Sequence, residues 1–173
     1  MVPYVRAFNE LPFTHDKSRM LVELQWEIVP DFFVFPIDRL GLWDRIDGWK
    51  KSESGLPIIP PEEMLLILCV HGAKDSWAKL NWVCDVAKLL NVHRDLDWDR
   101  IMKFANGLGG RRMLFVGLLL ANGLLDASLP GRLIKEIQTD REAKKMADQV
   151  AAKIFANPEE PPGVFETCIF YLR

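Results

Sequence analysis

Residues 60–90 constrain the fold of this chain more than any other segment. They read PPEEMLLILCVHGAKDSWAKLNWVCDVAKLL, a long apolar pattern of helical spacing that polar and aromatic residues interrupt. Burying a histidine, a lysine or an aspartate costs free energy unless the group finds a partner. The interruptions therefore indicate either a structural polar seam or a binding site. They are His71, Lys74, Asp75, Trp77 and Asp85.

The first thirty residues predict a β-hairpin. Two extended segments, Tyr4 to Phe13 and Met20 to Val29, are joined by the polar turn THDKSR. In the second segment apolar residues alternate with Glu23, Gln25 and Glu27, so one strand face is apolar and the other is polar in its middle. Two strands alone are marginally stable in water, and we expect other elements to cover the apolar face.

The rest of the chain predicts helices, which makes the fold class α+β and mostly α. We expect a hairpin over residues 1–30 and a helical domain of about seven helices over residues 31–173. Local signals bound these helices. The first expected helices are a short piece near Ile37 to Ile46, one that starts with Pro61 and one over Lys79 to Leu90. They are followed by one from the N-cap Asp97 to Gly107, one over Arg111 to Leu125 and a short one after Pro130. A Thr139–Glu142 capping box opens the last long helix, which ends near Phe155, and FETCIFYLR restarts an amphipathic pattern.

Composition excludes several classes of protein. With 173 residues, 49% hydrophobic and 27% charged, the chain is long enough for one domain with a sizeable core. A net charge of −2 gives no general attraction to nucleic acid or to anionic membranes. The apolar stretch from Met113 to Leu125 is too short to span a bilayer, and the N-terminus does not read as a signal peptide. We expect a cytoplasmic protein that binds neither nucleic acid nor membrane.

The three cysteines lack the spacing of a zinc site or a redox pair. Cys69 and Cys84 lie within apolar helical patterns, which favours core packing for both. Arg111 and Arg112 follow two glycines at a helix start, where they could meet an anion or simply be solvated.

The strand VELQWEI and the helical segment together resemble the C-terminal part of a family of uncharacterised bacterial nucleotidyltransferases. That family carries a D-L-H-W strand followed by L-x-x-H-x-x-K-x-x-W-x-x-L-x-W-x-x-D, and the resemblance spans Val22 to Pro130. It implies transfer of a nucleoside monophosphate from a nucleoside triphosphate to an unknown acceptor, with Mg²⁺ as cofactor. The hairpin would complete a nucleotidyltransferase-like sheet.

The resemblance also assigns roles to residues. Glu23 takes the acidic place of the D-L-H-W strand and would be a catalytic carboxylate and metal ligand, whereas Gln25 replaces the family's histidine. His71 and Lys74 would contact the nucleotide phosphates, and Asp85 would orient them as part of the nucleotide-binding set. The alternative is structural: a solvated strand face at Glu23, and a polar seam in which the helical residues pair with one another.

One part of such an enzyme is missing from the sequence. A glycine turn followed by two strand acids would complete the carboxylate cluster, and the nearest spacing, Asp95 and Asp97, fits helix capping better. We therefore expect a fragment or truncated relative that is inactive alone. A rival interpretation is a non-catalytic helical protein-interaction module. In either case we expect a homo-oligomer, formed by pairing of the Met20 to Val29 strand across a two-fold axis.

Overall fold

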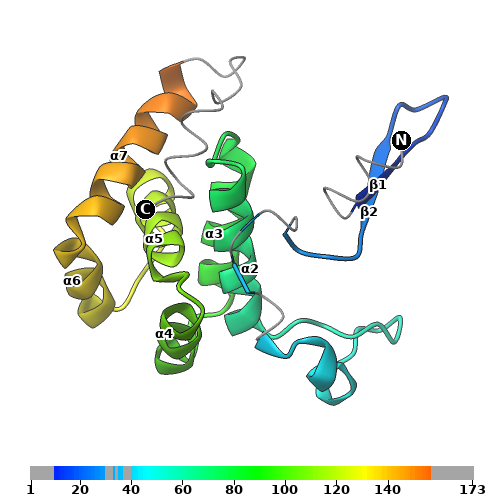
Figure 1. Cartoon of the computed structure of the whole chain (residues 1–173), viewed down its shortest axis with the longest axis horizontal. Helices are drawn as coiled ribbons and strands as arrows, with labels where there is room; N and C mark the ends of the chain where they lie inside the picture. Colours follow the sequence, from blue (N-terminus) through cyan, green and yellow to red (C-terminus); the bar gives the residue numbers. More distant parts are fainter. Residues whose placement is uncertain (1–9, 30–32, 34, 37–39, 157–173) are drawn as a thin grey trace.

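The computed structural model describes residues 10–29, 33, 35–36 and 40–156. A two-stranded antiparallel hairpin precedes the helices, which confirms the predicted α+β, mostly helical fold (Figure 1). The elements are β1 (Glu10–Thr14), β2 (Leu21–Gln25), the 3-10 helix η2 (Trp43–Gly48), α2 (Pro61–Lys74), α3 (Leu80–Val92), α4 (Trp98–Gly107), α5 (Arg111–Leu125), α6 (Gly131–Thr139) and α7 (Arg141–Ala156).

Helix α5 is the centre of the helical body. It contacts α2, α3, α4 and α7, and its side chains from Leu114 to Leu118 are buried. Figure 1 shows α5 between α7 on one side and α2 with α3 on the other. An apolar helix without charged residues after its first turn suits this position, because it has neighbours on several sides.

The side chain of Trp77 packs between α2 and α5. Ser76 and Trp77 both adopt a left-handed backbone with φ of 53°, and this turn folds the indole back beneath α2, where it is fully buried. The ring lies so close to Gly72 that a Cβ atom there would be 2.6 Å from it, and one at Gly117 would be 2.6 Å from the sulfur of Cys69. Two glycines therefore make the space that one tryptophan fills.

Local capping signals set several helix boundaries as predicted. Pro61 occupies the first turn of α2, and the Asp97 carboxylate accepts a hydrogen bond from the Arg100 amide at 3.0 Å. The start of α7 differs from the prediction. Asp140, rather than Thr139, accepts from the Ala143 amide, while the Thr139 hydroxyl donates to the Glu136 carbonyl.

Three further expectations need correction. The second strand ends at Gln25 rather than Val29, and Tyr4 to Asn9 of the predicted first strand lie outside the described residues. Of the helix expected near Ile37 to Ile46, residues 37–39 lie outside the described residues; after Gly41, whose φ is 57°, the chain forms the 3-10 helix η2 rather than an α-helix. Cys84 is exposed on α3, on the side opposite Val83 and Val86, whereas Cys69 is buried as predicted.

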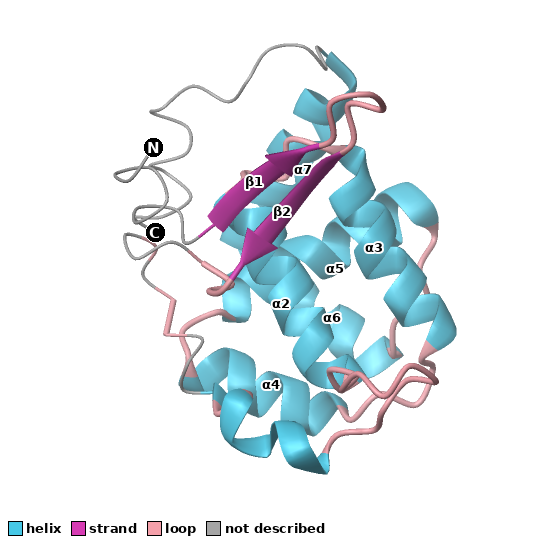
Figure 2. Cartoon of the chain, turned by 90° about the vertical axis from the view of Figure 1, so that its right-hand side faces the viewer, coloured by secondary structure: helices cyan, strands magenta, loops and turns pink. Residues whose placement is uncertain are grey.

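The hairpin stands apart from the helical body. Every residue of β2 is exposed, and Figure 2, viewed from the hairpin side, places both strands in front of the helices. The register pairs Leu11 with Leu24 and Phe13 with Val22. No helix of the described residues is long and apolar enough to cross a membrane.

Candidate functional site

The polar residues of the helical segment gather around one imidazole. His71 lies in the last turn of α2, half-buried, with its Nε2 atom 3.7 Å from an Asp75 carboxylate oxygen. The Lys74 ammonium lies 3.8 Å from the same oxygen, and only 14% of the Lys74 side chain is exposed. The predicted spacing of these three residues on one helical turn therefore produces a compact charged cluster.

Trp82 of α3 completes the surroundings of this imidazole. Its ring meets the His71 ring edge to face, with centroids 5.7 Å apart. The Lys79 ammonium lies 5.8 Å from the centroid of Trp82. The two tryptophans of the motif thus have different roles, because Trp77 is a core residue and Trp82 borders the polar cluster.

The environment of His71 lowers its pKa. Burial is the largest cause, since a charged imidazole loses hydration there, and the Lys74 charge adds to it. The carboxylates of Asp75, Glu23 and Asp85 oppose the shift without reversing it. The imidazole is therefore neutral at neutral pH, and it can donate or accept a hydrogen bond but supplies no positive charge.

These electrostatic effects place the hairpin acid near the helical cluster. Glu23 of β2 and Asp85 of α3 each act on the pKa of His71 from different elements. Glu23 is exposed, and no ion pair joins it to His71 in the part of the chain that the structure describes. The charges of Glu23 and Asp85 thus reach His71 from two other elements, and Lys74 with Asp75 forms the ion pair expected of the structural alternative.

Glu63 was missed by sequence reasoning. It lies in the first turn of α2, and its side chain is completely buried and contacts two arginines. Arg45 donates to Glu63 at 2.8 Å and to the Leu40 carbonyl at 2.8 Å, and Arg100 donates to the same Glu63 oxygen. No local signal could reveal this cluster, because Arg45 and Arg100 belong to η2 and α4.

Arg111 and Arg112, the alternative anion site, pair with acids instead. Arg111 donates to Glu136 at 3.3 Å and lies over the Phe115 ring, and Arg112 approaches Asp140 at 3.8 Å. These arginines line an open hollow of about 680 Å³ at the starts of α5 and α7. Three arginines and two acids line it, so its net positive charge is small and two of its arginines are already paired with acids.

The described residues do not form a metal centre by themselves. No group of three or more His, Cys, Asp or Glu side chains is placed to hold an ion in residues 10–29 or 40–156. Glu23 could supply one carboxylate ligand, but Mg²⁺ needs several oxygen ligands in near-octahedral geometry. A complete site would therefore require carboxylates beyond these.

The comparisons with known proteins identify the family. The model of a family described as uncharacterised nucleotidyltransferase matches residues 4–126, a stretch that includes the hairpin, the His71 cluster and α5. Since this is well over half of the chain, the protein belongs to that family. No curated protein and no solved structure matches the chain. The predicted resemblance is thus confirmed, and its extent exceeds the Val22 to Pro130 span toward the N-terminus.

Proposed function

We propose that the hairpin and the α2–α3 pair form one wall of a site for nucleotidyl transfer, in which a nucleoside monophosphate passes from a triphosphate to an unknown acceptor hydroxyl. The observation that carries this proposal is the convergence on His71. Residues of β2, α2 and α3 act on one imidazole, although Glu23 and Asp85 lie far apart in the sequence. Family membership supports the class of reaction.

Each residue of the wall has a proposed role. Lys74 supplies the positive charge that meets a phosphate group, because it is the cation whose charge acts on the imidazole most directly. His71 contacts the nucleotide as a neutral hydrogen-bonding group, and Asp85 helps to orient it. Glu23 provides a carboxylate that would ligate Mg²⁺ and so take part in catalysis.

The opposite side of this site, here called the second wall, must bring further carboxylates. The sequence has no glycine turn followed by paired strand acids, and the described residues alone do not hold a metal. The hairpin, residues 1–30, would complete a nucleotidyltransferase-like sheet that carries those acids, while residues 31–173 form the helical domain beside the nucleotide.

Nucleotide binding without transfer is the expected behaviour. In calorimetric titrations with a nucleoside triphosphate and Mg²⁺, we expect weak binding that Lys74→Ala reduces about tenfold, the effect of losing a charged contact of about 1.4 kcal/mol. Lys103→Ala, an exposed lysine of α4, is the matched control and should leave binding unchanged. Labelled triphosphate should give no transfer above that of a Glu23→Ala variant.

Two results would contradict this proposal in different ways. Equal binding by the Lys74 and Lys103 variants would remove the nucleotide site from the α2–α3 wall. Robust transfer that depends on Glu23 would show instead that the chain is a competent enzyme and needs no second wall.

A second candidate function is a non-catalytic protein-interaction module. The exposed apolar side chains of the hairpin favour it, because such surfaces mark contacts with other polypeptides. The titration separates the two candidates, since a module of this kind should bind no triphosphate.

A further inference from the structure

The strand register places most of the large apolar side chains of the hairpin on one face, whereas Leu21 lies on the other face with Glu23. Leu11 lies opposite Leu24, and Phe13 lies opposite Val22. Because side chains alternate along a strand, the flanking residues Met20 and Trp26 fall on the same side. We call this surface the hairpin apolar face; its members are Leu11, Phe13, Met20, Val22, Leu24 and Trp26.

The hairpin apolar face is open to solvent. Leu11 is half-buried, and the other five side chains are exposed by between 45% for Trp26 and 62% for Met20. An aromatic side chain has about 150–250 Å² of surface and an aliphatic one somewhat less, so the exposed parts add up to roughly 500 Å² at most. Patches of this size on soluble proteins are commonly interaction sites.

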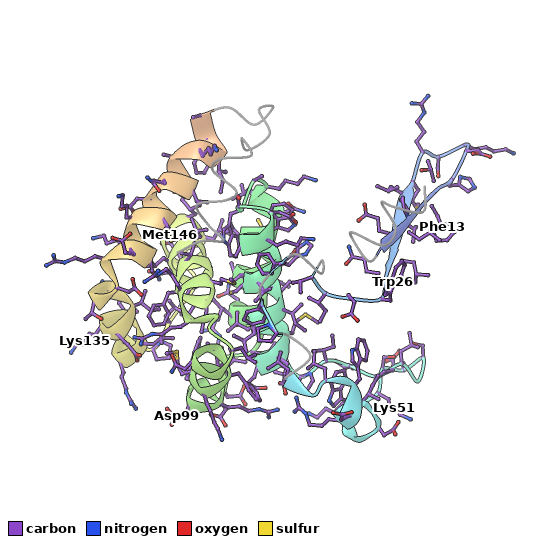
Figure 3. All side chains as sticks on the ribbon, viewed as in Figure 1. Phe13, Trp26, Lys51, Asp99, Lys135 and Met146 are labelled. Carbon is purple, nitrogen blue, oxygen red and sulfur yellow. The ribbon has the colours of Figure 1, made fainter. Side chains whose placement is uncertain are left out.

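The face is turned away from the helices. Glu23 occupies the opposite face of β2, and its charge reaches His71 on α2. Figure 3 agrees, because Phe13 and Trp26 lie on the hairpin away from the helical body. The described helices of the same chain therefore do not cover these side chains.

We propose that a second copy of this chain covers the hairpin apolar face, with the two faces stacked across a two-fold axis. No member of the face is charged, so an identical surface meets it without burying an unpaired ion. Two copies would remove roughly 1,000 Å² from solvent, which is the lower limit for a stable interface. An isologous contact of this kind closes after two subunits.

This arrangement differs from the edge-to-edge strand pairing expected from the sequence. Edge pairing would satisfy backbone groups but leave the apolar side chains in water. Stacking buries them, and this burial is the dominant favourable term in association. The inference does not depend on nucleotide binding, because the polar face with Glu23 stays toward α2.

Sedimentation and light scattering of the full chain over a dilution series test the proposal. We expect a mass twice the 19.9 kDa of one chain that falls to the single value on dilution. Leu24→Lys should raise the dimer dissociation constant at least tenfold, because it places a charge within the stacked face. Gln25→Lys adds the same charge at the next residue on the opposite face and should leave the constant within about twofold.

The dimer dissociation constants of the two variants distinguish the hairpin apolar face from other possible interfaces. A monomer at every concentration would overturn the proposal, as would equal effects of Leu24→Lys and Gln25→Lys, which would indicate edge pairing or another interface. Circular dichroism should show the same helical content in both variants, because both positions are exposed in β2. If the wild-type chain dimerises but does not bind triphosphate, the result contradicts the proposed function and leaves the proposed dimer standing.

Discussion

At the scale of single residues, the packing of Trp77 depends on two neighbouring positions that have no side chain. Its ring occupies space that exists only because Gly72 and Gly117 have no side chains. Its backbone lies in the left-handed region, which costs a bulky residue free energy that the buried contacts must offset. The family motif has a tryptophan at this position, and in the structure this side chain packs in the core.

Gly117→Ala should destabilise the protein by about 1–3 kcal/mol, the usual cost of adding a methyl group to a packed core. The new Cβ would lie 2.6 Å from the Cys69 sulfur and 3.0 Å from the Trp77 ring. Gly123→Ala in the same helix meets nothing within 4 Å and should stabilise by about 0.5–1 kcal/mol. Urea denaturation measures both, and equal effects would contradict the packing of Trp77.

The lowered pKa of His71 predicts how stability changes with pH. Because the folded pKa lies below the ordinary value of about 6.5, the unfolded state binds more protons between the two values. The free energy of unfolding should therefore rise with pH through this window and be constant, as far as His71 is concerned, below and above it. Burial is the main cause, so the sign is opposite to that of a histidine stabilised by a carboxylate.

Urea denaturation of the wild type and of His71→Gln between about pH 5 and pH 7.5 isolates this contribution. The difference between the two proteins should favour the wild type more at the higher pH. Proton NMR titration of the His71 ring gives its pKa directly. A value at or above the ordinary one would contradict the burial argument.

At the scale of elements, the buried Glu63 joins three segments that differ in character. It lies in α2 and binds Arg45 of η2 and Arg100 of α4, and Arg45 also donates to the carbonyl groups of Leu40 and Gly41. A loop region with little core of its own is thereby tied to the helical body. One Glu63 oxygen makes no hydrogen bond in the described structure, so both arginines share the other.

Glu63→Ala should lower the free energy of unfolding by about 1.5–3 kcal/mol, the contribution of charged hydrogen bonds, because the two arginines lose their common partner but remain partly exposed to water. Glu62→Ala, one residue earlier, removes only a 3.2 Å hydrogen bond to the Asp97 amide and should cost at most about 1 kcal/mol. Chemical denaturation compares the two variants. Similar losses would mean that the buried Glu63 cluster contributes no more to stability than the single hydrogen bond of its half-buried neighbour Glu62.

Elements with local signals were predictable, and those that depend on distant partners were not. The bounds of α4 and α5 follow from Asp97 and from the glycines after Ala105, which act within a few residues. The cap of α7 was misassigned because Thr139 and Asp140 are adjacent candidates and the Asp140 carboxylate prevails. The 3-10 helix η2 depends on Arg45 contacts that sequence spacing does not encode.

At the scale of the whole molecule, the sequence indicated the parts of the site but not their assembly. The shared helical face of His71 and Lys74 follows from spacing alone. That Glu23 lies toward them could be expected only from the family resemblance, because strand and helices meet through tertiary packing. The hairpin apolar face was predicted from alternation, but not its orientation away from the helices.

The contrast between the buried indole of Trp77 and the exposed indole of Trp26 has a spectroscopic consequence. Trp77 is withdrawn from water inside the helical body, and Trp26 is 45% exposed on the hairpin. Indole emission shifts to longer wavelength in a wetter environment, so the two side chains emit in different parts of the fluorescence spectrum. Since the chain has six tryptophans and Trp43 is also exposed, the difference between the wild type and a Trp26→Phe variant isolates the emission that reports on what covers the hairpin, and a Trp77→Phe variant does the same for the helices.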